Sequence, residues 1–126
     1  GTELLVPYTG ICHSFANNNG AGDYGPTVIL QHRINSQTFY SLYGHLSQAS
    51  LEALHPGKLL TTGSHLGYVG SQSENGGWPP HVHVQLITDI GKYRGDFPGV
   101  CAHTNKNQWL TRCPNPNWLL KLPYIE

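Results

Sequence analysis

Short β-prone runs separated by turn residues dominate the hydrophobic pattern of the chain. The two strongest runs, residues 27–32 (TVILQH) and 38–43 (TFYSLY), are rich in β-branched and aromatic side chains. Asn35-Ser36, between them, predicts a hairpin turn. Weaker strands are expected at 3–6, 10–15, 81–87, and at 59–60 paired with 65–69 around Gly63. Because residues 47–55 allow only one helical turn and no repeat is present, the pattern predicts an all-β fold, an antiparallel sandwich or barrel with little helix.

The rest of the sequence consists of two polar loops and a C-terminal part with a weak strand pattern. Residues 17–25 and 71–80 are rich in Gly and Asn, and the second loop is long enough to be typical of a binding or catalytic rim. After Asp89 the strand pattern fades, a turn is expected at 96–99, and the prolines near residue 115 predict a linker-like stretch.

The run that begins with His81-Val82-His83 contains candidate metal-binding residues. In a strand, alternate side chains project to opposite faces, so His81, His83 and Gln85 share one face. The opposite face, formed by the intervening apolar residues, is the expected core side. Two imidazoles about 6.5–7 Å apart along a strand suit metal ligation. The alternative is that they are exposed polar residues of a two-faced strand. His45, at the end of the 38–43 strand, is a third histidine that taken singly predicts only a surface residue.

The charge composition argues against two classes of binding partner for this protein. The chain has 126 residues, enough for one domain, with 7 basic and 7 acidic residues and a formal net charge of zero. This balance argues against nucleic-acid binding, which requires a basic surface, and against a polybasic membrane module. No apolar run approaches the length of a transmembrane helix. Among the 8 histidines, His32, His55, His65 and His103 have no predicted functional partner and are expected at the surface or satisfied in the core.

The three cysteines, Cys12, Cys101 and Cys113, lack the spacing of a zinc knuckle. Their odd number favours a reducing compartment, and a Cys101–Cys113 disulfide is the competing interpretation. The sequence contains no G-x-S-x-G or P-loop motif and no matched Cys/His arrangement. Serine, phosphate-binding and thiol mechanisms therefore lack support.

Four short motifs follow one another along the chain, at residues 24–32, 39–47, 62–70 and 81–85. Together these motifs resemble the lysostaphin/LytM-type zinc peptidases, peptidase family M23. Residues 24–32 (YGPTVILQH) are similar to the family's YGN-x-V-x-I-x-H strand, and residues 39–47 (FYSLYGHLS) to its T-x-YAHLS segment. Residues 62–70 (TGSHLGYVG) resemble its G-x-x-I-G-x-x-G run, and 81–85 (HVHVQ) its HLHFE motif. The resemblance covers roughly residues 1–86. It implies an antiparallel β fold of the M23 type, with residues 1–90 as a peptidase core and 91–126 as a C-terminal extension that packs on it.

The resemblance also implies roles for three histidines. His83 would ligate zinc, whereas His45 and His81 would face the zinc-bound water and the substrate carbonyl as general base and oxyanion donors. The family's substrates are peptide bonds of the bacterial cell wall, often beside Gly or a D-amino acid, so the implied partner is a peptide in a groove. Export to the cell envelope is usual for the family.

Two departures from the family pattern affect this expectation. The family's other zinc ligands come from an H-x-x-x-D segment, and no such segment occurs in this sequence, where residues 1–10 match the strand that follows it. A catalytic zinc needs three protein ligands, and His13 and Asp23 are the substitutes that the sequence offers. Either the missing segment lies upstream, or the domain binds without cutting. In addition, Gln85 stands where the family often has Glu.

The tail carries a separate resemblance. Residues 96–100 (DFPGV) and 109–120 are similar to the end of the M23-type module in large bacterial fusions, where it lies between a phosphotransferase domain and a class III aminotransferase domain. This resemblance implies a cytoplasmic accessory domain with covalently linked neighbours. The alternative is an ordinary extension that packs Trp109 and Trp118 over the sheet.

Overall fold

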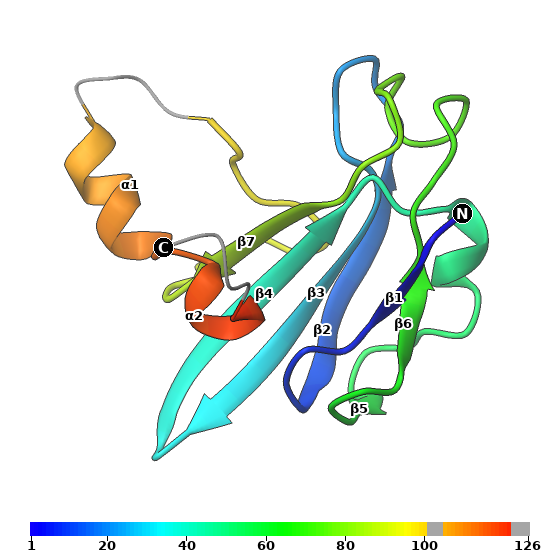
Figure 1. Cartoon of the computed structure of the whole chain (residues 1–126). Coiled ribbons are helices and arrows are strands. Elements are labelled where there is room, and N and C mark those ends of the chain that lie inside the picture. The colour runs from blue at the N-terminus through cyan, green and yellow to red at the C-terminus, as the bar shows by residue number, and fades with distance from the viewer. Residues whose placement is uncertain (101–104, 122–126) are drawn as a thin grey trace.

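The computed structural model describes residues 1–100 and 105–121 and confirms a mostly antiparallel β fold with little helix. A five-stranded sheet has the order β5-β2-β3-β4-β7, and a smaller sheet pairs β1 with β6 (Figure 1). The strands are β1 (Glu3–Leu5), β2 (Gly10–Asn18), β3 (Gly25–Ile34), β4 (Gln37–Gly44), β5 (Leu59–Leu60), β6 (His65–Tyr68) and β7 (His83–Ile87). The helices are the 3-10 turn η1 (Gln48–Leu51), α1 (Lys106–Arg112) and α2 (Asn117–Leu120).

The predicted hairpin is the centre of the large sheet. β3 pairs with β4 in a register that ends at Ile34 and Gln37, so the turn consists of two residues. Asn35 and Ser36 both have positive φ, at 49° and 69°. Two residues in the left-handed region are the signature of a type I′ turn, whose twist matches that of the flanking strands.

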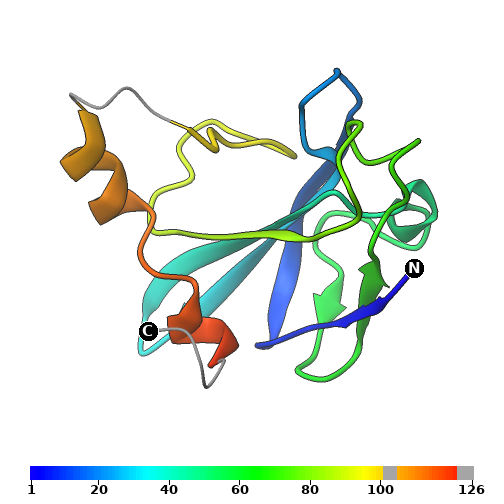
Figure 2. The ribbon, with the colours of Figure 1, turned by 45° about the horizontal axis from the view of Figure 1, so that its top comes forward.

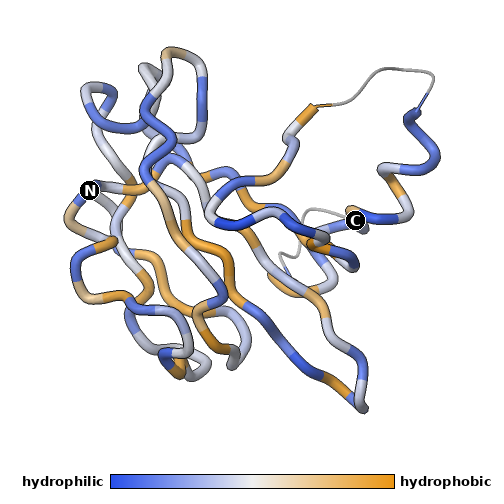
Figure 3. Tube along the Cα trace, turned by 180° about the vertical axis from the view of Figure 1, so that it is seen from behind, coloured by the Kyte–Doolittle hydropathy of each residue, from blue (hydrophilic) through white to orange (hydrophobic). Residues whose placement is uncertain are grey.

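The centre of β3 is covered on both faces, which explains its three consecutive apolar residues, 28–30. Val28 and Leu30 belong to a core cluster with residues of β1, β5 and β6, whereas Ile29 belongs to a second cluster with Phe97, beyond β7. All three side chains of β3 are completely buried. Figure 2 shows the small sheet on one side of the large sheet and the segment after β7 with the two helices on the other. Hydrophobic residues follow the middle of the strands, and hydrophilic ones gather in the loops (Figure 3).

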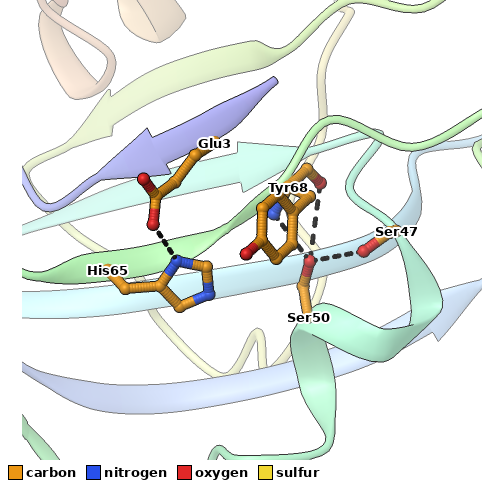
Figure 4. A network of polar contacts seen from close by, with 5 residues as sticks. All are labelled: Glu3, Ser47, Ser50, His65 and Tyr68. Atoms are coloured by element: carbon orange, nitrogen blue, oxygen red, sulfur yellow. Dashed lines mark hydrogen bonds and ion pairs between the residues drawn. The ribbon is translucent and has the colours of Figure 1, made fainter. Parts of the chain in front are cut away.

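The short helical turn predicted within residues 47–55 is confirmed as η1, and one serine fastens it to the small sheet. Ser50 Oγ accepts a hydrogen bond from the Tyr68 backbone N–H at 2.9 Å and lies 2.7 Å from Ser47 Oγ (Figure 4). On the same strand β6, His65 Nδ1 contacts the Glu3 carboxylate at 2.8 Å, across the β1–β6 pair. These contacts join segments that are distant in the sequence.

The prediction that residues 59–60 pair with 65–69 is wrong. β5 pairs with β2, and β6 pairs with β1. The chain before β5 is already bound to β2, because the Cys12 N–H donates to the Lys58 carbonyl and the Gly57 N–H to the Cys12 carbonyl. A turn closed by the Ser64 N–H and the Thr61 carbonyl then carries the chain from the large sheet to the small one.

The strand expected from residue 81 begins two residues later, at His83. His83 pairs with Gly44, the last residue of β4. β4 ends there because the next residue, His45, adopts a left-handed backbone conformation with φ 64°. Pro79 and Pro80, just upstream, have no N–H to donate to a ladder. His81 therefore belongs to the loop and does not share a strand face with His83.

The tail contains two helices that the sequence pattern did not predict. α1 and α2 lie in the stretch expected to be irregular, and their apolar residues pack only partly. Trp109 lies edge-on against Phe97 with ring centroids 5.8 Å apart, whereas Trp118 is 72% exposed. Among the residues that the structure describes, no helix is long and apolar enough to cross a membrane.

Candidate functional site

A pocket of about 600 Å³ lies at the end of the large sheet where β4 finishes and β7 begins. The loop before β3, the loop before β7 and the segment after β7 supply most of its lining residues. Figures 1 and 2 show the course of these three segments. The lining includes all three histidines singled out by the sequence. Its side chains come from Asp23, Tyr24, His45, Trp78, His81, His83, Tyr93, Asp96 and Phe97, among others.

The three histidines converge in this pocket from three different parts of the chain. His45 follows β4, His81 ends the long loop, and His83 opens β7. The ring centroids of His45 and His81 are 4.2 Å apart, and those of His45 and His83 are 6.2 Å apart. The structure thus brings together the residues that the sequence proposed, although their catalytic and metal-binding roles remain predictions.

His45 is the most constrained of the three. Its side chain is buried, and Nδ1 lies 2.8 Å from the Asn75 carbonyl oxygen. Since a carbonyl can only accept, Nδ1 carries the proton and Nε2 keeps its lone pair. Burial lowers the pKa of His45, and the nearby His81 and His83 lower it further, against the opposing effects of the Asn75 hydrogen bond and Asp23. His45 is therefore neutral at neutral pH, with one nitrogen available as a proton acceptor.

His81 and His83 are held by different partners. His81 is exposed, and its Nδ1 donates to the Pro79 carbonyl at 2.7 Å, which again leaves Nε2 as the acceptor. His83 is half-buried, with Nε2 3.1 Å from Gln85 Oε1. The ring of Tyr24 lies beside that of His83 at a centroid distance of 4.9 Å. Burial, together with Asp96 and Asp23, raises the pKa of Tyr24 to about 12, so its hydroxyl stays a neutral donor.

Asn75 organises the long loop and was missed by the sequence analysis. Its side chain is completely buried: Nδ2 donates to the carbonyls of Trp78 and Gly70, and Oδ1 accepts from the Trp78 N–H. Its own carbonyl orients His45. In a loop rich in Gly, Ser and Asn, nothing in the sequence distinguishes this asparagine from its neighbours.

Two carboxylates give the pocket an acidic edge. Asp23 accepts a hydrogen bond from the Tyr24 N–H, and Asp96 accepts one from the Phe97 N–H. Partial burial, with a further contribution from Asp23, raises the pKa of Asp96. Asp96 could not be assigned to the site from the sequence, because the turn that contains it returns to the pocket only through tertiary packing of Phe97.

The remaining candidates lie elsewhere or have structural partners. His13 is on β2, with Nδ1 2.8 Å from Ser14 Oγ and its ring against Tyr40, so it does not join Asp23 in the pocket. His32 is buried and bonded through both ring nitrogens. His103 and Cys101 lie outside the described residues, so the expectations for them and for a Cys101–Cys113 bridge stay predictions.

The donor set of the pocket does not fit a complete zinc site. Within the described residues, no group of three or more His, Cys, Asp or Glu side chains is arranged to hold a metal ion. Of the substitutes considered, His13 is outside the pocket, and Asp23 directs one carboxylate oxygen to a backbone N–H. A catalytic zinc requires three protein ligands. No catalytic step is therefore derived through zinc from these residues.

The fold and the site define an antiparallel β domain with three histidines that converge at one end of its large sheet. The chain belongs to peptidase family M23, whose family model matches residues 1–94. The match ends close to Phe97 and leaves α1 and α2 outside it.

Solved structures show the same fold. The catalytic domain of lysostaphin, an antimicrobial peptidase from Staphylococcus simulans, matches with a TM-score of 0.63 and 20% identity over 97% of this chain and 72% of that one. The catalytic domain of a mutant of EnpA, a prophage-encoded M23 protein from Enterococcus faecalis, matches with a TM-score of 0.55 and 21% identity over 79% of this chain and 72% of that one. No curated protein matches the sequence.

Proposed function

We propose that this domain binds a peptide of the bacterial cell-wall type in the pocket of His45, His81 and His83. We further propose that it cuts such a peptide only when additional ligands complete a zinc site. Membership of a peptidase family supports the substrate class. The observation that carries the proposal is the convergence of the three histidines, with centroids 4.2 and 6.2 Å apart, beside an exposed tryptophan.

The pocket offers hydrogen-bond acceptors and an apolar surface to a peptide. His45 and His81 each present an Nε2 acceptor, because their Nδ1 protons are engaged by carbonyls. Such acceptors bind peptide N–H groups in the resting state. Trp78, 42% exposed, adds an apolar surface along the same edge. The neutral state of His45 would also let it take a proton from an attacking water in a complete site.

Hydrolysis is the part of the proposal that depends on residues beyond this set. His83 is the single zinc ligand that the family resemblance assigns to the described pocket, and zinc would supply Lewis-acid activation of water. A noncatalytic peptide-binding domain is the second candidate function, and the incomplete donor set favours it. The two candidates share the pocket and differ in metal content.

Two measurements on the same protein test the proposal. Titration with a glycine-rich peptide, followed by amide NMR shifts, should perturb residues around the pocket, and His45→Ala should weaken binding about tenfold, as expected for the loss of one or two hydrogen bonds. His55→Ala, an exposed histidine outside the pocket, is the matched control. No perturbation near His45, His81 or His83 would refute peptide binding there.

Elemental analysis of the purified chain and of His83→Ala addresses the metal. The expected result is far less than one zinc per chain in both proteins and no cleavage of the peptide. Near-stoichiometric zinc that is lost in His83→Ala would show that the chain completes its own site, and Asp23 would then be the next ligand to test. Absence of zinc would show that the residues of this chain do not complete a metal site by themselves.

A further inference from the structure

The side chain of Gln85 connects His83 to the segment after β7, and no role has yet been assigned to it. Gln85 lies on β7 two residues after His83, so both side chains project from the same face of the strand. Four groups surround its amide at hydrogen-bond distance. These are His83 Nε2 at 3.1 Å, the Tyr24 hydroxyl at 3.4 Å, the Pro98 carbonyl at 3.1 Å and Cys113 Sγ at 3.1 Å.

The Pro98 carbonyl determines which way the amide faces. A carbonyl oxygen can only accept, so the NH₂ group of Gln85 must point toward Pro98. The same NH₂ group donates its second proton to Cys113 Sγ. The amide oxygen is consequently turned toward Tyr24 and His83. The orientation of this amide thus follows from chemistry, and the reversed orientation would place oxygen against oxygen at Pro98.

The amide oxygen in turn determines the state of His83. Gln85 Oε1 can only accept, so His83 Nε2 must carry a proton. A neutral His83 therefore keeps its lone pair on Nδ1. This is the opposite of His45 and His81, whose Nδ1 atoms donate to carbonyls and whose Nε2 atoms hold the lone pair. The pocket combines histidines of both tautomers, and Gln85 is the residue that makes His83 differ.

We propose that Gln85 is a positioning residue that fixes the ring of His83 and, through the Pro98 carbonyl, holds residues 96–100 as one wall of the pocket. Asp96, Phe97, Pro98, Gly99 and Val100 all line that pocket. The positional role matters to function only if the proposed peptide binding holds, but the hydrogen bonds themselves do not depend on it. Glutamine supplies the donor that the contacts with the Pro98 carbonyl and Cys113 Sγ require, which a glutamate, frequent at this position in the family, lacks when ionised.

A glutamate at position 85 could satisfy only half of these partners. Its carboxylate would still accept from His83 Nε2 and from the Tyr24 hydroxyl. Against the Pro98 carbonyl, 3.1 Å from the present amide nitrogen, it would place a second acceptor and repel the segment. Gln85→Glu therefore separates the two roles, because it keeps the constraint on His83 and removes the one on Pro98. Gln85→Met removes both at similar volume.

NMR of the histidine rings and backbone amides tests the proposal without peptide or metal. In its neutral form, wild-type His83 should carry its proton on Nε2, protected from exchange with water. In Gln85→Met that proton should exchange at least about tenfold faster, the loss expected for one hydrogen bond. In Gln85→Glu it should stay protected, while the amide of Gly99, which shares a peptide with the Pro98 carbonyl, shifts.

Gln37→Met, an exposed glutamine at the far end of the hairpin, is the control for the substitution itself. Unchanged amide shifts in β3 would show that each variant is folded. A proton on Nδ1 of wild-type His83, or equal exchange rates in the wild type and Gln85→Met, would overturn the proposal. Failure of peptide binding with the expected NMR result would instead count against the proposed function alone.

Discussion

Two buried histidines, His32 and His45, occupy different ends of the same sheet and are used in different ways. His32, in β3, is 1% exposed; Nδ1 lies 3.0 Å from the Thr9 carbonyl, and Nε2 lies 2.6 Å from Ser41 Oγ. Its ring stacks on Phe39 at 4.9 Å. His45 is 5% exposed, and among the described residues only its Nδ1 has such a partner. Burial is nearly equal at the two positions, so it does not distinguish them.

The two histidines differ in how many ring nitrogens form hydrogen bonds within the protein. Both nitrogens of His32 are satisfied by the protein, so its hydrogen bonds serve the fold. His45 retains an acceptor at a pocket lined by two other histidines. A histidine with a free nitrogen at a cavity is a candidate for function, whereas a fully bonded one is a candidate for stability. The contrast predicts that mutation of His32 mainly lowers stability, whereas mutation of His45 mainly weakens peptide binding.

The largest expected effect is on stability at His32. His32→Ala should lower the free energy of unfolding by about 3 kcal/mol, because it leaves a cavity and two polar groups without their partner. His45→Ala, beside an open pocket, should cost about 1 kcal/mol and should weaken peptide binding instead. Urea unfolding of both variants beside the wild type measures the difference. Equal losses would mean that His45 is as structural as His32.

Asn75→Ala should have the next largest effect and, of the two histidines, should disturb His45 alone. The buried side chain makes hydrogen bonds to Gly70 and Trp78, and its loss should cost about 2 kcal/mol. The substitution keeps the backbone carbonyl that orients His45 but removes the side-chain bonds that hold this part of the loop in place. The ring shifts of His45 should therefore change, while those of His32 stay constant. Histidine NMR spectra provide the measurement, and coupled changes at both rings would contradict the separation.

A smaller effect is expected from pH. Burial lowers the pKa of His32, against a smaller opposing effect of its bond to Thr9, so the unfolded chain binds more protons than the folded one below about pH 6.5. Stability should therefore fall as pH decreases through this value toward the lowered pKa. His32→Gln should reduce the slope without abolishing it, since the pKa values of His13 and His45 are also lowered. Chemical unfolding at about pH 5 and about pH 7.5 measures the slope, and an unchanged slope in His32→Gln would exclude His32 as a contributor.

Local patterns predicted the part of the fold that depends on neighbours in sequence. The 27–32 and 38–43 runs and the turn at Asn35-Ser36 determine the central hairpin by composition alone. The partner of β5 could not be predicted, because Leu59 and Leu60 are apolar enough for either sheet. The hydrogen bonds of Cys12 with Gly57 and Lys58 hold this segment on the large sheet. The same limitation applies to β7, whose start depends on where β4 ends.

The site residues that belong to sequence motifs could be predicted. Those that reach the pocket only through tertiary packing could not. His45, His81 and His83 came from motifs, and the structure brings them together. Asn75 and Asp96 contribute through a loop carbonyl and through a turn anchored by Phe97, and neither contact leaves a spacing in the sequence. The helices of the tail were missed because their faces are short and only partly buried.

The two-residue turn of the β3–β4 hairpin also has a consequence for the order in which the chain folds. Its strands meet across Asn35 and Ser36, so the hairpin closes with almost no loss of loop entropy. By contrast, β5 must reach Gly10 from Leu60, and β6 must reach Glu3 from Tyr68. Contacts between such distant segments form slowly. We therefore expect the hairpin to act as the nucleus on which the rest of the sheet assembles, with the pocket completed last, when the loop of Asn75 and the segment of Phe97 dock.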